Sequence, residues 1–212
     1  MPLGVAAICG LLASATFIVG LVIGDIVQPE PFSPADDDVS DLGALTATHP
    51  WIDNQIAANL NGLLIIAFAL GLWSVLGAGW LARLGVLCLA VLGLMRFLEG
   101  FLRLDCQGID TGCENTSWQS SGHGIESGIS AALFFIAPPV LAFAFKRLPD
   151  WHSLWLPTLL AVPVVIAASV LFSVIGDGAA VRAASVTWFL WLGLVALRLL
   201  RVDRGGTVGP AR

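Results

Sequence analysis

The sequence predicts an all-α membrane protein: a bundle of six transmembrane helices with both the N- and the C-terminus in the cytoplasm. Three observations support this fold class. Of the 212 residues, 57% are hydrophobic and only 12% are charged, which is too little charge to cover the surface of a soluble domain. Six apolar stretches come close to the ~20 residues that a helix needs to cross a bilayer. The basic residues also gather on one side of the resulting topology.

The six stretches occupy well over half of the chain. We place them at 3–24, 56–77, 81–104, 124–145, 153–175 and 184–200, with outer loops at 25–55, 105–123 and 176–183. The longest outer loop is too short to hold a core of its own, so we predict one transmembrane domain over 1–212. The stretches are continuous rather than alternating, which excludes a β-barrel. The first stretch has no preceding Lys or Arg and exceeds a typical signal-peptide core, which favours a retained helix over a cleaved leader.

The orientation follows from the basic residues. With the N-terminus inside, seven lie on the cytoplasmic side: Arg83, Lys146, Arg147, Arg198, Arg201, Arg204 and Arg212. Arg103 and Arg182 lie outside, and Arg96 lies within a helix. The acidic residues fall mostly outside, so the net charge of -5 belongs to the outer face and argues against a nucleic-acid partner. A single Lys beside nine Arg is typical of a GC-rich bacterial genome, and we expect a multi-pass protein of a bacterial plasma membrane.

The four cysteines divide into two pairs. Cys9 and Cys88 lie inside predicted helices, where a thiol behaves as a small apolar group. Cys106 and Cys113 flank a short outer loop with two glycines, and an oxidising compartment would allow them to form a structural disulfide. Two free thiols, or a redox or metal role, are the alternatives, although the absence of a CxxC motif disfavours thiol exchange.

Charged residues in the third predicted helix are the sharpest signal in the chain. Arg96, Glu99 and Arg103 are spaced i, i+3 and i+7, so we expect them on one helical face, where Glu99 can pair with either arginine. Charges within a membrane helix are costly, and they normally face the interior of the bundle or water. This face would open toward the outer leaflet.

The fourth predicted helix begins with a second polar face, formed by His123, Glu126, Ser127 and Ser130. Three interpretations of the two faces stay open. The polar groups could serve only helix packing, helped by small residues such as Gly20, Gly24, Gly124 and Gly128.

Alternatively, the faces could line a pocket for a lipid head group or a small anionic ligand, with Arg96, Glu99, Arg103, His123 and Glu126 as its binding residues. The third interpretation is an intramembrane hydrolase or lipid-modifying enzyme that uses His123 as a general acid or base beside Asp41, Asp105 or Glu126.

We expect membrane lipid as the partner, and neither a cofactor nor a metal site. A zinc site would have only two outer histidines, His49 and His123, with Asp41 or Glu126 to complete it. There is no P-loop, GxSxG or HExxH motif.

Three short elements carry a resemblance to a known family: Ser40-Asp41-Leu42-Gly43, Asp105 and His123. In order and spacing, over nearly the whole chain, the sequence resembles the bacterial membrane family known as domain of unknown function 998. That family is in turn similar to eukaryotic six-span proteins of the damage-regulated autophagy modulator and Sfk type. The resemblance implies a six-span fold with Asp41, Asp105 and His123 gathered outside, and it points to membrane-lipid roles without supplying a reaction. The Leu-Arg-Leu-Asp-Cys stretch lacks the Phe-Pro step expected before the Asp.

Overall fold

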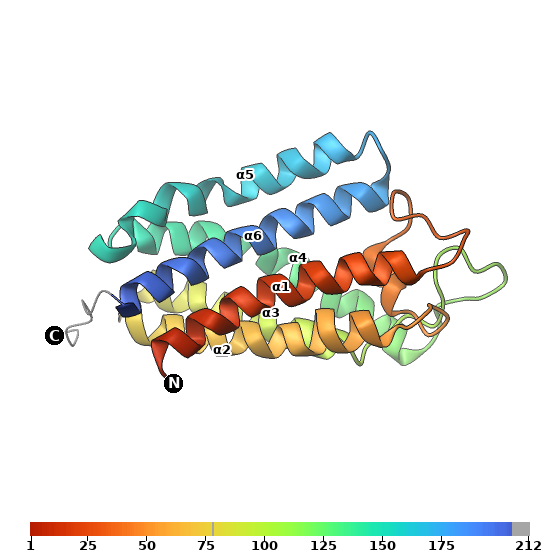
Figure 1. The fold of residues 1–212 in the computed structure, drawn as a ribbon, viewed down its shortest axis with the longest axis horizontal. Coiled ribbons are helices and arrows are strands. Elements are labelled where there is room, and N and C mark those ends of the chain that lie inside the picture. The colour runs from red at the N-terminus through yellow and green to blue at the C-terminus, as the bar shows by residue number, and fades with distance from the viewer. Residues whose placement is uncertain (78, 205–212) are drawn as a thin grey trace.

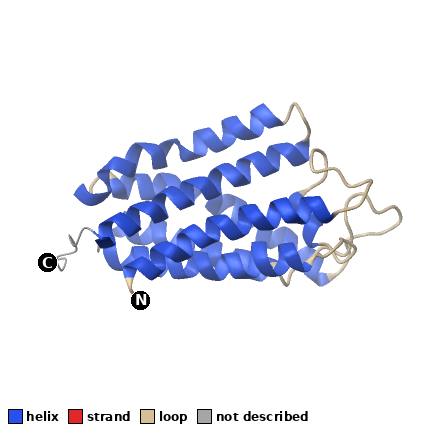
Figure 2. Cartoon of the chain, viewed as in Figure 1, coloured by secondary structure: helices blue, strands red, loops and turns tan. Residues whose placement is uncertain are grey.

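The computed structural model describes residues 1–77 and 79–204 as a bundle of helices, and these two stretches contain no strand (Figure 2). Six helical segments are long and apolar enough to cross a membrane. They are α1 (Leu3–Val27), η2 (Ile52–Leu60) continued by α2 (Asn61–Val75), α3 (Trp80–Glu99), α4 (Trp118–Phe145), η3 (Pro149–Leu154) continued by α5 (Trp155–Phe172), and α6 (Asp177–Arg204). The predicted class, an all-helical multi-pass membrane protein, is confirmed. Arg212, one of the basic residues used for the orientation, lies outside the described residues.

The helices follow one another around the bundle in chain order (Figure 1). α1 packs against α2 on one side and α6 on the other, α3 lies between α2 and α4, and α5 contacts both α4 and α6. α1 begins, and α6 ends, at the same end of the bundle. Six crossings therefore return the chain to the side from which it started.

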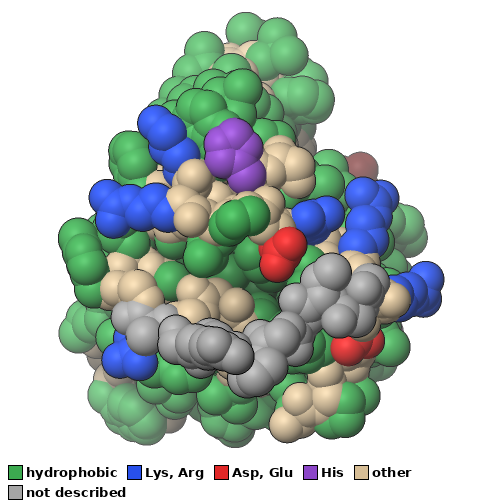
Figure 3. All heavy atoms as spheres, turned by 90° about the vertical axis from the view of Figure 1, so that its left-hand side faces the viewer, with side chains coloured by type: hydrophobic (Ala, Val, Ile, Leu, Met, Phe, Trp, Pro, Cys, Tyr) green, Lys and Arg blue, Asp and Glu red, His purple; other side chains and the backbone are tan. Residues whose placement is uncertain are grey.

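The two ends of the bundle differ in their connections. At one end, which we name the long-loop end, lie segments 28–51, 100–117 and 173–176. The first of these contains the short 3-10 helix η1 (Val39–Gly43). Short connections join the helices at the opposite end, which we name the short-loop end. Lys and Arg side chains are distributed around the short-loop end (Figure 3).

The helix ends differ from the predicted spans mainly where polar residues extend an apolar centre. α4 begins at Trp118 rather than at residue 124, because Ser117 caps it: the Ser117 hydroxyl oxygen accepts a hydrogen bond from the Ser120 N–H at 3.1 Å. α6 likewise extends beyond 184–200 at both ends. Hydropathy marks the apolar part of a membrane helix, and capping chemistry sets its ends.

α3 ends earlier than predicted, at Glu99 rather than at residue 104. At Gly100 the chain passes so close to η2 that a Cβ atom would lie 2.2 Å from the Asn54 carbonyl oxygen and 2.3 Å from the Asn59 side chain. The chain then leaves the helical path at this glycine and begins the long segment that leads to α4. The residues after Gly100 therefore do not continue the face of α3.

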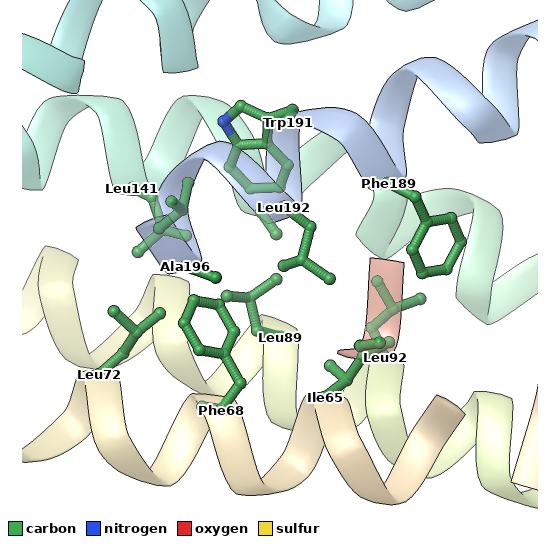
Figure 4. Close-up of a cluster of buried hydrophobic side chains, with 14 of the residues drawn as sticks. Ile65, Phe68, Leu72, Leu89, Leu92, Leu141, Phe189, Trp191, Leu192 and Ala196 are labelled. Carbon is green, nitrogen blue, oxygen red and sulfur yellow. The ribbon is translucent and has the colours of Figure 1, made fainter. Parts of the chain in front are cut away.

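The middle of the bundle is filled with apolar side chains from all six membrane-spanning segments, and Figure 4 shows part of this core. Those labelled are Ile65, Phe68 and Leu72 from α2, Leu89 and Leu92 from α3, Leu141 from α4, and Phe189, Trp191, Leu192 and Ala196 from α6. The outward faces are apolar as well, with exposed side chains such as Leu63, Leu70, Val170 and Leu190. A helix that is apolar on all sides suits an environment in which lipid replaces water.

The glycines expected to allow close helix approach fall into two groups. A Cβ atom at Gly20 would lie 2.8 Å from the Ala57 Cβ, and one at Gly24 would lie 3.2 Å from an apolar side chain. A Cβ atom at Gly124 or Gly128 would meet nothing within 4 Å. The prediction was therefore wrong for these last two glycines, because their side of α4 faces away from the other helices.

Candidate functional site

Arg96 and Glu99 form an ion pair one turn apart at the end of α3. The Arg96 guanidinium also donates a hydrogen bond of 2.6 Å to the Ala57 carbonyl oxygen, and its central carbon lies 5.3 Å from the centre of the Phe17 ring. Of the three guanidinium nitrogens, Nε is buried and has no hydrogen-bond partner among the described residues. The predicted pairing of Glu99 with an arginine is confirmed for Arg96.

Arg103 lies elsewhere, so the prediction of one helical face for all three charges was wrong. It follows the end of α3, is exposed, and forms no ion pair with another described residue. Its neighbours are Glu99 and Asp53, in a narrow crevice beside the ion pair. The i, i+7 spacing applies only to a continuous helix, and the turn at Gly100 interrupts it.

The polar face predicted at the start of α4 is present. The His123 Nδ1 lies 3.0 Å from the Leu102 carbonyl oxygen, and its Nε2 lies 3.4 Å from the Ser127 hydroxyl. The Ser130 hydroxyl donates a 2.5 Å hydrogen bond to Glu126 Oε1. Glu126 is 3% exposed, and its second oxygen, Oε2, has no hydrogen-bond partner among the described residues.

The two polar faces line one cavity of about 310 Å³ at the long-loop end, which we name the main cavity. It is lined by Phe17 from α1, Asp38, Val39 and Ser40 from the segment before α2, Arg96 and Glu99 from α3, His123, Glu126, Ser127 and Ser130 from α4, and Val181 and Ser185 from α6. At about 30 Å³ for each molecule, this space would hold roughly ten waters. The structure thus brings Arg96, Glu99, His123 and Glu126 together in the main cavity, whereas Arg103 lies in the adjoining crevice with Glu99 and His123.

An aromatic cluster lies below the polar level of the main cavity. The Phe17 and Phe189 rings stack 4.0 Å apart, and the Phe134 and Trp188 rings stack 4.8 Å apart. The Trp188 Nε1 donates a 3.0 Å hydrogen bond to the Phe134 carbonyl oxygen, which joins α6 to α4. These four rings line a second space of about 130 Å³, which shares Phe17, Arg96, Ser130 and Ser185 with the main cavity.

Charge in the main cavity is predominantly negative. Asp38, Glu99 and Glu126 contribute three carboxylates, and Arg96 contributes the single guanidinium. That guanidinium is already bound to Glu99 and to a backbone carbonyl. Of the two arginines that the sequence analysis assigned to the pocket, Arg96 lines the main cavity and Arg103 does not.

Asp53, a residue that sequence reasoning assigned to the outer loop, lies beside this site. It is 5% exposed and lies in the crevice with Glu99 and His123. Its side chain forms no hydrogen bond with the rest of the described chain. The signal that could have revealed it is the Asp53-Asn54 pair directly before an apolar stretch, since η2 extends the second helix through both residues.

The two other predicted carboxylates, Asp41 and Asp105, also lie at the long-loop end, but neither is hydrogen-bonded to His123. Asp41 is buried in η1, and that burial raises the pKa of its carboxyl above the ordinary 3.8. Asp105 accepts backbone hydrogen bonds of 2.9 Å from Thr116 and 2.8 Å from Ser117, while bonds from the Ser117 side chain and these backbone groups lower its pKa. Asp105 therefore binds the backbone just before α4. The expected pair of His123 with Asp41 or Asp105 is not formed.

The Cys106–Cys113 disulfide is present, with a Cα–Cα distance of 6.1 Å. The loop that it closes is held to the first long segment, because Asp110 Oδ2 accepts a 2.5 Å hydrogen bond from the Thr46 hydroxyl. The Gln107 side chain donates to the Asp41 carbonyl oxygen at 3.3 Å. The two long segments thus form one connected cover over this end of the bundle.

A metal site and a groove between α5 and α6 are the two alternatives to the main cavity. No group of three or more His, Cys, Asp or Glu side chains in residues 1–77 and 79–204 is placed to hold a metal ion, so the two-histidine zinc arrangement is not formed there. A larger groove of about 550 Å³ lies between α5 and α6, but its lining is apolar except for Arg182 and Thr187. Arg182 is bound to Asp25. The main cavity is therefore the better candidate for polar chemistry.

Comparison with protein-family models identifies a family for this chain. A family model described as "Protein of unknown function (DUF998)" matches residues 11–198. No curated protein and no solved structure matches the chain. The resemblance that Ser40-Asp41-Leu42-Gly43, Asp105 and His123 indicated is thus confirmed for this family.

Proposed function

We propose that this protein, which belongs to the DUF998 family of proteins of unknown function, binds the head group of a membrane lipid in the main cavity. One observation carries the proposal. The cavity has room for a ligand, and two buried polar atoms of residues that line it, Arg96 Nε and Glu126 Oε2, have no partner among the described residues. A buried polar group without a partner costs free energy, and a bound head group would supply the missing hydrogen bonds.

The position of the cavity in the bundle supports a lipid as the source of the ligand. Its walls come from α1, α3, α4 and α6, and no residue of α5 lines it. Outward-facing residues of α4 at this level, such as Ile125 and Ile129, are exposed and apolar, as expected for a surface in contact with acyl chains. A lipid with its tails on this surface would have its head group at the level of the polar walls.

We also propose that the long-loop end faces outward and that the membrane is a bacterial plasma membrane. Among the described residues, the basic side chains Arg83, Lys146, Arg147, Arg198, Arg201 and Arg204 belong to the short-loop end. The positive-inside rule assigns such an end to the cytoplasm. A disulfide at the long-loop end supports the same orientation, because disulfides persist in oxidising compartments. The ligand would then come from the outer leaflet.

Native mass spectrometry of gently extracted protein tests the proposal. The wild-type protein should retain a phospholipid, and Ser185→Leu should lose it, because the larger side chain fills the cavity and Ser185 donates no hydrogen bond that the change would remove. Ser74→Leu is the control, since Ser74 is exposed near the short-loop end and loses only the hydrogen bond of its hydroxyl to the Gly71 carbonyl of the same helix. Arg96→Ala should also lose the lipid, because it removes the free Nε.

Equal retention of lipid by the wild-type protein, Ser185→Leu and Arg96→Ala would contradict lipid binding in this cavity. A purely structural role for the polar residues makes a different prediction. In that case Arg96→Ala would unfold the protein, and no phospholipid would be found on the folded wild-type protein.

A further inference from the structure

We infer that the ligand of the main cavity carries a primary ammonium group beside a phosphate, as an ethanolamine phospholipid does. This inference rests on the proposed function and specifies its substrate class. It follows from which polar atoms of the cavity are free and from the sign of its charge.

The free polar atom on the α4 wall is a hydrogen-bond acceptor. Glu126 Oε2 is buried and has no partner among the described residues. In a neutral His123 ring, the contact of Nδ1 with the Leu102 carbonyl requires Nδ1 to donate, so Nε2 accepts from the Ser127 hydroxyl and is already satisfied. A ligand that satisfies Glu126 Oε2 must bring a donor, and a primary ammonium brings three N–H groups.

The charge balance favours a cation at the same place. Three acidic side chains and one guanidinium line the cavity, the guanidinium is paired with Glu99, and a bound ammonium would favour the ionised form of Glu126. A head group with only negative charge would face the acidic side chains of Glu126 and Asp38, and Arg96, the one guanidinium that lines the cavity, is already paired with Glu99. A small anionic ligand and an anionic glycerol phospholipid are therefore disfavoured relative to a zwitterion.

A quaternary ammonium fits less well than a primary one. It has no N–H to donate, and proteins bind it through faces of aromatic rings. The chain contains no tyrosine. The ring of Phe17 that lines the cavity already lies under the Arg96 guanidinium, and the Trp188 ring stacks on Phe134. The aromatic faces near the cavity are thus occupied by other groups.

The remaining donors suit the phosphate end of the zwitterion. Arg96 Nε is a buried donor without a partner in the described chain, and charged N–H groups form strong hydrogen bonds to phosphate oxygens. Ser40 and Ser185 add two further hydroxyl donors to the lining of the cavity. One ligand would therefore bind Glu126 of α4 with its ammonium and Arg96 of α3 with its phosphate.

The same chemistry occurs in a membrane lipid and in a water-soluble phosphoethanolamine, and the experiment separates these sources. Delipidated wild-type protein is titrated with phosphatidylethanolamine, phosphatidylcholine and phosphatidylglycerol of identical acyl chains, and binding is measured by native mass spectrometry. We expect at least tenfold tighter binding of the ethanolamine lipid. Glycerophosphoethanolamine, which lacks acyl chains, should compete only weakly; stronger binding of this soluble compound than of the lipid would overturn the lipid source.

A variant that changes the charge of Glu126 but not its size tests the role of this residue in binding the ammonium. Glu126→Gln keeps the size and one acceptor oxygen but removes the charge, so it should abolish the preference for the ethanolamine lipid. Glu114→Gln is the matched control, because Glu114 is exposed at the same end and does not line the cavity. It should bind the three lipids as the wild-type protein does.

Different results would refute the proposal of lipid binding and the inference of an ammonium ligand. If the wild-type protein binds the three lipids equally, or prefers phosphatidylglycerol, the ammonium inference is wrong and lipid binding stands. Binding of none of the three would overturn both. The comparison of head groups uses only wild-type protein, so the inference can be refuted even if Glu126→Gln does not fold.

Discussion

Arg182 on α6 and Asp25 on α1, separated by 157 positions in the sequence, form an ion pair at the long-loop end, with the Arg182 Nη2 2.8 Å from Asp25 Oδ1. The Arg182 Nε donates to both carboxylate oxygens, and its Nη1 donates to the Asp37 carbonyl oxygen at 2.7 Å. One guanidinium thus holds the first helix, the last helix and the segment that covers the main cavity.

Removing this guanidinium should destabilise the protein. Arg182→Ala leaves the Asp25 carboxylate largely buried without its partner, for which we expect a loss of about 3 kcal/mol in the free energy of unfolding. Thermal unfolding in detergent measures the effect. Arg201→Ala, at an exposed position near the short-loop end, should change the melting temperature little. A similar melting temperature for Arg182→Ala and the wild-type protein would show that the pair does not stabilise the bundle.

A glycine contact between α2 and α3 gives a second prediction. A Cβ atom at Gly62 would lie 2.4 Å from the Gly93 carbonyl oxygen, so Gly62→Ala must push the two helices apart. Overpacking of this kind costs about 1–3 kcal/mol. Gly124→Ala is the control, because its added Cβ meets nothing within 4 Å and alanine is the better helix former by roughly 0.5–1 kcal/mol. The two variants should shift the melting temperature in opposite directions, and a gain in stability for Gly62→Ala would contradict the close approach.

Asp41 and Asp105 should give opposite dependences of stability on pH. Burial raises the pKa of Asp41 in the folded protein, so its contribution is most favourable below the ordinary 3.8 and is lost as pH rises through the raised pKa. Hydrogen bonds lower the pKa of Asp105, so its contribution is present above 3.8 and is lost as pH falls through the lowered pKa.

The corresponding variants are Asp41→Asn and Asp105→Asn. At neutral pH the first should raise the melting temperature, because it removes a buried charge, and the second should lower it, because it removes the charge that accepts the Thr116 and Ser117 N–H groups. Both differences from the wild-type protein should shrink as the pH is lowered into the acidic range. Differences of the same sign at neutral pH would refute the assignment for one of the two carboxylates.

The disulfide and the proposed orientation can be tested together. A labelling reagent for free thiols, applied to the denatured protein, should modify Cys9 and Cys88 without reductant, and Cys106 and Cys113 only after reduction. Replacing Cys106 and Cys113 by serine should lower stability by roughly 2–3 kcal/mol in the chain-entropy account of a loop this short. If four thiols react in protein from unreduced cells, the long-loop end does not face an oxidising compartment.

Much of the fold could be predicted from the sequence because its causes are local. Continuous apolar stretches determined the six helices, and the spacing from His123 to Glu126 and Ser130 determined a polar face within one helix. The pairing of Arg96 with Glu99 follows from the same helical geometry. The short, glycine-containing loop between Cys106 and Cys113 was likewise sufficient to indicate the disulfide.

The sequence by itself therefore determined the six apolar helices, the polar ends of the third and fourth, and the cysteine pair. Only the tertiary structure decided the composition and charge of the main cavity. Arg103 is outside it because the chain turns at Gly100, whereas Asp38 and Phe17 line it from distant parts of the sequence. The physical reason is that the charge of a cavity is a sum over residues from several segments, and periodicity within one helix does not specify which segments meet.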